Sequence, residues 1–227
     1  MKERPILFSA PMVRAILDGR KTMTRRALNP QPDGGIQFGA IATPHGVVNG
    51  KGNPLVCRYG KPGDRLWVRE TWMADPSCDD DAWDDHHVSW REWDGCGCRT
   101  RDIPTQLCKV ENVIHKASWD GIEMVGWKPS IHMPRWASRI LLEVTGVRVE
   151  RLQDISEEDA IAEGVESLGP PENVWTRSNG EKRHWRERGY RSQAECLFSD
   201  LWKSISGAES WDSNPWVWVI EFKVLQS

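Results

Sequence analysis

Long apolar runs are absent from this chain of 227 residues. A helix that crosses a membrane needs about 20 mostly apolar residues, and no apolar run of even about 18 residues occurs here. The first residues also lack the apolar stretch of a signal peptide. A mean hydropathy of -0.58 and a hydrophobic content of 39% are typical of a soluble globular protein. We therefore expect no membrane partner and a cytoplasmic location.

A large excess of charge of either sign is missing as well. The chain has 30 Lys and Arg against 33 Asp and Glu, which gives a net charge of -3 and a pI of about 6.1. Non-specific binding of nucleic acid depends on a basic surface, so this balance argues against that class of protein. It is compatible with a local basic cleft.

Cysteines with the repeated close spacing of a structural zinc site are also missing. The one close pair among the six cysteines is Cys96-x-Cys98, and no second pair follows it. Thiols of a cytoplasmic protein stay reduced, so the even number of cysteines does not predict disulfides. We expect unligated thiols rather than zinc, and neither a metal nor a cofactor. The candidate zinc ligands would be Cys78, His86, His87, Cys96, Cys98 and Cys108.

Tyrosine and phenylalanine are few, at 2 and 4 residues, whereas tryptophan is abundant at 14. Indole rings stack on bases, which suits a protein that binds single-stranded nucleic acid. Trp202, Trp216 and Trp218, however, occupy core-like positions in periodic segments. We expect most tryptophans to pack in the core or at domain edges, so their number identifies no ligand.

The hydrophobic pattern predicts several strands and few helices. An apolar helical face covers residues 12–17, and Gly19 can end that helix in a left-handed conformation. Capping boxes at Ser156 and Ser192 begin two later helices, and Gly164 ends the first of these. Strands are expected at residues 6–8, 65–72 (alternating, as in a half-buried strand), 138–152 and 216–224.

The other segments are interpreted as connections or insertions. Residues 29–62 and 169–190 are rich in Pro and Gly and show little periodicity. Residues 75–94 carry eight acidic side chains against one arginine, a patch that repels phosphate. We interpret this patch as a surface insertion, with a lid or a partner contact as the alternatives. The order of elements indicates an α+β class and is consistent with a small mixed β-barrel.

The residues after the first helix form the most informative stretch. Residues 20–26 read Arg-Lys-Thr-Met-Thr-Arg-Arg, which places four cations and two hydroxyls together. A lysine three residues before a threonine can supply a base and a nucleophile, although such basic runs are more often solvated surfaces. Residues three apart point to opposite faces of a strand, so Lys21 is expected in the turn before the strand.

Five segments form an ordered set of motifs, at residues 16–25, 63–68, 142–145, 155–164 and 216–222. This set resembles the ASCH domain family, whose members are PUA-like β-barrels associated with RNA. The resemblance implies one PUA-like domain over residues 1–227, with a few helices. Residues 130–136 are similar to long members found in phages and prophages. The implied insertions are at about residues 29–60, 75–134 and 165–212.

Some small members of this family remove the acetyl group from N4-acetylcytidine by means of a lysine, a threonine and a glutamate. The matching positions in this chain are Lys21, Thr24 and Glu163. The resemblance implies that Thr24 is the nucleophile, that Lys21 is the base, and that Glu163 orients the lysine or the substrate amine. Glu163 also precedes a helix-ending glycine, where the helix dipole disfavours an anion, and this favours its pairing with Lys21 or Arg20.

The proposed base needs help from its surroundings. A lysine with an ordinary pKa of about 10.4 is almost entirely protonated at pH 7, so burial or nearby cations must lower that pKa. Arg20, Arg25 and Arg26 are expected to supply this field and to bind a substrate phosphate or carbonyl oxygen.

Two other functions are open at this point. The chain can be a non-catalytic module whose basic loop contacts RNA or DNA phosphates while exposed tryptophans stack on bases. It can also be a nuclease that uses the same basic cleft. The expected partner is therefore a nucleoside or RNA, and the sequence indicates no oligomeric state.

Overall fold

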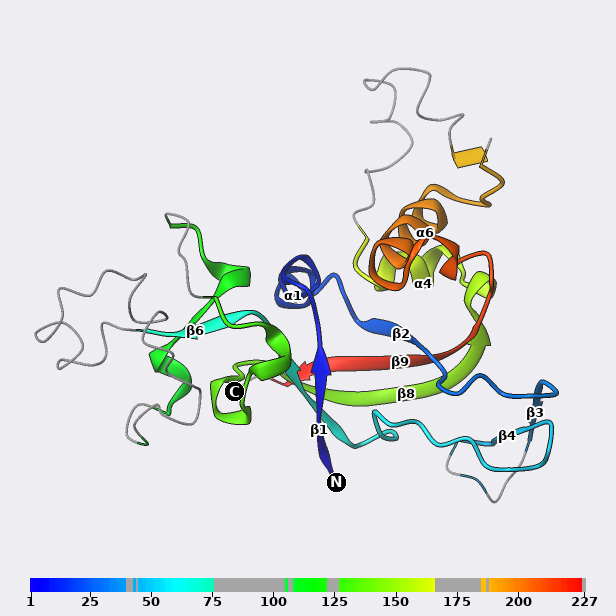
Figure 1. The fold of residues 1–227 in the computed structure, drawn as a ribbon, viewed down its shortest axis with the longest axis horizontal. Helices are drawn as coiled ribbons and strands as arrows, with labels where there is room; N and C mark the ends of the chain where they lie inside the picture. Colours follow the sequence, from blue (N-terminus) through cyan, green and yellow to red (C-terminus); the bar gives the residue numbers. More distant parts are fainter. Residues whose placement is uncertain are drawn as a thin grey trace, which may run out of the picture. The chain divides into compact units, whose positions relative to one another are not determined.

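The computed structural model describes residues 1–39, 43, 45–75, 105, 108–121, 127–165, 185–186 and 188–225. Its mixture of helices and sheets confirms the α+β class (Figure 1). The chain forms two compact units, each of which is assembled from separate stretches of sequence. The first comprises Met1–Leu17, Arg65–Glu143 and Val224–Ser227, and the second comprises Asp18–Asp64 and Val144–Lys223.

The first unit is built around a central strand, β5 (Arg65–Arg69). It runs parallel to β1 (Glu3–Leu7) and antiparallel to the first residues of β8 (Leu141–Arg151). Leu66, Trp67 and Val68 are at most 8% exposed, and because neighbouring residues point to opposite faces, both faces of β5 are covered. The expectation of a half-buried, alternating strand is therefore wrong.

A helix and a small ladder complete the first unit. The predicted first helix is α1 (Ala10–Leu17), which buries Val13, Ala15 and Ile16. Strand β6 (Trp72–Ala74) pairs with β7 (Val113–His115), which lies within the insertion expected at about residues 75–134. Short 3-10 helices lie at Val110–Asn112, Lys116–Ser118, Ser130–His132 and Arg135–Ala137.

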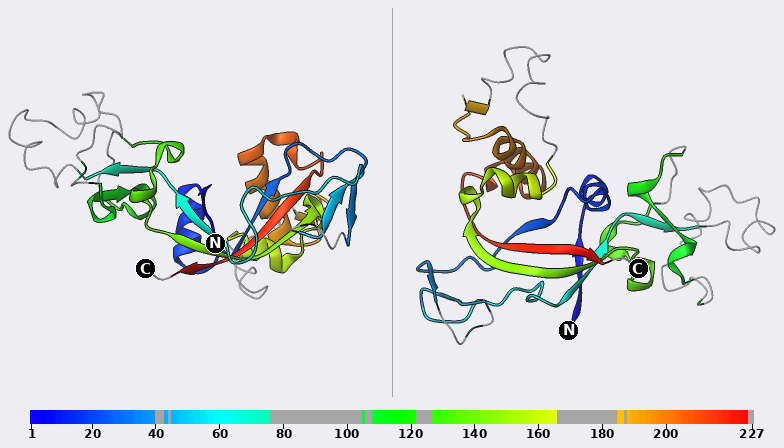
Figure 2. Two further views of the ribbon diagram at one scale, coloured as in Figure 1. Left: turned by 90° about the horizontal axis from the view of Figure 1, so that it is seen from below. Right: turned by 180° about the vertical axis from the view of Figure 1, so that it is seen from behind.

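The second unit packs two helices on one face of its strands. Strand β2 (Met23–Ala27) runs antiparallel to β9 (Trp216–Leu225), which neighbours β8. Helices α4 (Glu157–Ala162) and α6 (Gln193–Ser206) lie together over these strands (Figures 1 and 2). The shared core contains Met23, Leu152, Ile155, Ala160, Phe198, Trp202, Trp211, Val217 and Val219.

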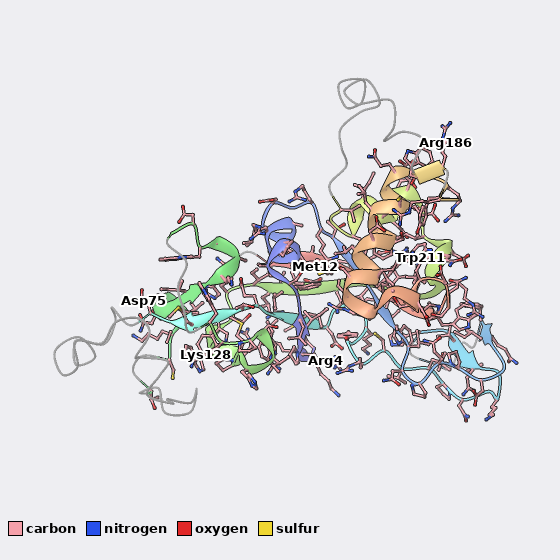
Figure 3. The ribbon with its side chains drawn as sticks, turned by 45° about the horizontal axis from the view of Figure 1, so that its top comes forward. Arg4, Met12, Asp75, Lys128, Arg186 and Trp211 are labelled. Atoms are coloured by element: carbon pink, nitrogen blue, oxygen red, sulfur yellow. The ribbon has the colours of Figure 1, made fainter. Side chains whose placement is uncertain are left out.

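Aromatic rings fill the space beneath α6. Trp211, which Figure 3 labels, packs edge-on against Phe198 with ring centroids 6.2 Å apart. Trp202 and Trp218 are buried as expected, and Trp216 is partly buried. Further 3-10 helices lie at Leu152–Asp154 and Ala208–Ser210.

Both predicted capping residues begin their helices. The hydroxyl oxygen of Ser156 accepts a hydrogen bond from the backbone N–H of Asp159, and that of Ser192 accepts one from Glu195, each at 3.1 Å. Gly164 follows α4 with a φ of 86°, a left-handed conformation that glycine adopts without strain.

The segment at residues 29–62 is more regular than expected. It contains a hairpin of β3 (Ile36–Phe38) and β4 (Val47–Asn49), which is visible in Figure 1. Within neither unit do the pairings of the described strands close into a barrel. In the described part of the chain, no helix is both long enough and apolar enough to cross a membrane.

Candidate functional site

The loop before β2 is fixed by backbone hydrogen bonds on both sides. The N–H of Thr22 donates to the carbonyl oxygen of Ala162 at the end of α4, and the carbonyl oxygen of Thr22 accepts from Phe222 of β9, each at 2.9 Å. Lys21 therefore lies in the loop and not within β2, as the spacing of Lys21 and Thr24 predicted.

Lys21 reaches from this loop to the end of α4. Its Nζ donates hydrogen bonds to both Oε2 and the backbone carbonyl oxygen of Glu163, each at 2.7 Å. The two side chains are 0% and 3% exposed. Glu163 directly follows the last residue of α4, where the helix dipole disfavours an anion, and the ammonium group offsets this effect.

The surroundings of Lys21 lower its pKa. Burial lowers the pKa of Lys21 below its ordinary value of 10.5, and Arg26 and Arg25 lower it further by repulsion. The Glu163 carboxylate raises the pKa by attraction and hydrogen bonding, but the effect of burial is larger. A lysine in this position is closer to serving as a base than an exposed lysine is.

Arg25 extends from β2 toward the same carboxylate. Its Nη1 lies 3.4 Å from Oε1 of Glu163, while its Nη2 donates to Asp159 at 2.6 Å and to Glu150 at 3.1 Å. The side chain is fully buried, and its guanidinium carbon lies 5.9 Å from the ring centroid of Phe198. The guanidinium group of Arg25, which the sequence predicts to bind substrate, therefore contacts three carboxylates of the protein itself.

Arg148 on β8 joins this cluster from its more exposed side. It donates to the same Asp159 oxygen as Arg25, at 2.6 Å, and also to Glu150 and to Glu221 of β9. The sequence reasoning missed this network. One signal was available, because Arg148 and Glu150 are two apart in a predicted strand and therefore share a face.

Thr24 and Arg26 lie on the other face of β2. Thr24 is 2% exposed and is paired with Ile220 of β9. Alternation along the strand directs Thr24 and Arg26 away from the side that Arg25 occupies. Burial lowers the pKa of Arg26, while Tyr59 and Glu163 raise it. Glu163 therefore interacts with charged groups from both faces of β2.

The structure brings Lys21, Arg25 and Glu163 into contact and places Thr24 three residues from Lys21 on the adjoining strand. Arg20 lies apart from this contact. It is exposed and pairs with Asp18 at 2.9 Å.

Of the zinc candidates, only Cys108 lies within the described residues. Cys57 and Cys196 are buried, and Cys108 is partly buried. Among the residues that the structure describes, no group of three or more His, Cys, Asp or Glu side chains is arranged to hold a metal ion. The remaining zinc candidates, Cys78, His86, His87, Cys96 and Cys98, lie outside the described residues, as does almost all of the acidic segment.

The first unit has a buried ion pair of its own, which sequence reasoning did not identify. Arg139 donates two parallel hydrogen bonds of 3.0 Å to the carboxylate of Glu70, which is 1% exposed. His115 is also buried, with Nε2 3.0 Å from the carbonyl oxygen of Ala137. Burial lowers the pKa of His115, although the hydrogen bond to Ala137 and the charge of Glu70 raise it.

We expect His115 to make stability depend on pH. Its pKa is lower in the folded protein than in the unfolded chain, where it is about 6.5. The unfolded chain therefore binds more protons as the pH falls below about 6.5, and stability is lost in that range. His115→Gln should flatten this dependence, as measured by urea unfolding at a series of pH values. The exposed His132→Gln is the control, and equal pH slopes for His115→Gln and the wild type would contradict the assignment.

The chain was compared with family models, curated proteins and solved structures. No family model matches the chain, and neither a curated protein nor a solved structure does.

Proposed function

We propose that this protein is an amidohydrolase that removes the acyl group from an acylated nucleoside such as N4-acetylcytidine. The observation that carries the proposal is the buried contact of Lys21 with Glu163, two residues 142 positions apart, in surroundings that lower the lysine pKa. The motif resemblance selects the same two residues and Thr24. It also leads us to propose a PUA-like fold of the ASCH type.

The proposed reaction uses Thr24 as the nucleophile. Neutral Lys21 accepts the proton of the Thr24 hydroxyl as its oxygen attacks the acyl carbon. The bond between the acyl carbon and the nucleoside nitrogen then breaks, and the proton passes to that nitrogen. Water hydrolyses the acyl ester of Thr24 and regenerates the hydroxyl. A threonine hydroxyl is a weak nucleophile without a base, so the step depends on Lys21.

Glu163 orients the base in this scheme. Its carbonyl and carboxylate oxygens both accept hydrogen bonds from Nζ of Lys21. A neutral amine has two N–H donors and one lone pair, so these two bonds direct the lone pair away from Glu163. The geometry of the contact therefore supports a role for Glu163 in aiming Lys21.

Burial has consequences for both chemistry and access. Lys21, Thr24 and Glu163 are each at most 3% exposed. Exclusion of bulk water strengthens electrostatic interactions within such a site. A substrate reaches these groups only when the side chains that cover them move.

The test is to incubate the wild-type protein with N4-acetylcytidine and to measure the release of cytidine and acetate by chromatography. We expect turnover whose rate rises from neutral to alkaline pH, because Lys21 must lose its proton to act as a base. Protein that is inert toward N4-acetylcytidine and related amides over this range would contradict the proposal. Binding of single-stranded RNA without turnover would instead indicate the non-catalytic binding module.

A further inference from the structure

The carboxylate of Glu163 is shared between two cations. Its Oε2 accepts from Nζ of Lys21 at 2.7 Å, while its Oε1 lies 3.4 Å from Nη1 of Arg25. A carboxylate that offered both oxygens to Lys21 would stabilise the ammonium form more strongly. Arg25 therefore competes with Lys21 for the negative charge of this carboxylate.

Arg25 is itself held in a fixed position. Its Nη2 lies between Asp159 and Glu150, at 2.6 Å and 3.1 Å. Arg148 also contacts Asp159 and Glu150. It therefore helps to hold the two carboxylates that position Arg25. A planar guanidinium group can bridge several carboxylates in this way, whereas a lysine ammonium acts as a point charge.

We infer that Arg25 is a positioning residue, which holds the Glu163 carboxylate in the orientation that leaves Lys21 able to act as a base. This inference rests on the proposed function, and it gives Arg25 a role different from the substrate binding expected from the sequence. Arg25 acts through Glu163 and does not touch the substrate. The repulsion between Arg25 and Lys21 works in the same direction.

Several other charged or titratable groups surround the pair, so the effect of Arg25 must be separated from theirs. Arg25 is distinguished from the outer groups by its direct approach to Glu163. Arg25 and Arg26 on β2 act on Lys21 directly. The groups that act on these two arginines or on their partners are Arg148 and Glu150 on β8, Asp159 on α4, Glu221 on β9, and Arg58 and Tyr59 in the loop before β5.

The test is an NMR titration of the Lys21 side chain in the full-length wild type and in Arg25→Gln. The Lys21 signal is identified by its loss in Lys21→Met. Removal of a neighbouring charge shifts a pKa by about 1 to 3 units, so we expect the Lys21 pKa to rise by about one pH unit. The pH profile of kcat/KM for N4-acetylcytidine should move to higher pH by the same amount.

Two further variants complete the design. Arg188→Gln removes a cation that pairs with Asp200 on α6, and should leave the Lys21 pKa unchanged. Arg25→Lys keeps the charge but cannot bridge Asp159 and Glu163 together, so it should raise the Lys21 pKa by a smaller amount. If Arg25→Gln does not fold, the Lys21 pKa in Arg25→Lys decides whether Arg25 positions Glu163.

The inference and the proposed function can fail separately. An unchanged Lys21 pKa in both Arg25 variants, whatever their stability, would show that Arg25 has only a structural role and would overturn the inference. The NMR titration gives this answer even if the wild type has no hydrolytic activity. A wild-type protein that shows no hydrolytic activity, by contrast, would overturn the proposed function alone.

Discussion

Thr24→Ala is expected to lower kcat/KM for N4-acetylcytidine by at least about 10³-fold, because it removes the nucleophile. Lys21→Met should cause a loss of similar size, since the hydroxyl then has no base. A nucleophile and its base act as a unit, so the double variant should be little worse than either single variant. Steady-state kinetics on the three purified variants measures these losses.

Thr22→Ala provides the matched control for Thr24→Ala. Thr22 is the same residue type two positions earlier, but its side chain is exposed. Its replacement should leave kcat/KM nearly unchanged. Thr24→Ala that folds normally and retains wild-type activity would exclude Thr24 as the nucleophile.

Glu163→Ala is expected to lower the free energy of unfolding by about 3–5 kcal/mol at neutral pH, because it leaves a buried cation without its carboxylate. Lys21 can instead lose its proton, at a cost of about 1.4 kcal/mol for each unit by which its ordinary pKa exceeds the pH. The destabilisation should therefore shrink as the pH rises toward 10.5, the ordinary pKa of the Lys21 side chain.

Urea unfolding at several pH values tests this expectation. Glu158→Ala is the control, because Glu158 is an exposed residue of the same helix, and its replacement should change stability by no more than about 0.5 kcal/mol. If Glu163→Ala and Glu158→Ala change the free energy of unfolding equally at neutral pH, the contact of Glu163 with Lys21 contributes little to the stability of the folded state.

Helix ends were predictable because their signals are local. Ser156, Ser192 and Gly164 each act on backbone groups within a few residues, so the sequence alone places them. The strands β3, β4, β6 and β7 were missed because each has three residues, too few to show an alternating pattern. The partner of β6 is β7, about 40 residues further along the chain, and no local signal identifies that pairing.

The candidate site was predictable only in part, for a related reason. The motif resemblance and the position of Glu163 at a helix end favoured a pair of Glu163 with Lys21 or Arg20, and the structure has the pair with Lys21. The partners of Arg25 were not predictable, because Glu150 and Asp159 are 125 and 134 residues away from it in the sequence. An arginine in a basic run resembles a phosphate ligand until the fold shows which carboxylates surround it.

The pKa of Lys21, measured by NMR and compared with the pH profile of kcat/KM for N4-acetylcytidine, tests the role of the buried pair most directly. We expect Lys21 to titrate below its ordinary value of 10.5, and we expect kcat/KM to rise with the same midpoint. A Lys21 side chain that titrates at or above 10.5, or a kcat/KM that does not follow its titration, would contradict the assignment of Lys21 as the base.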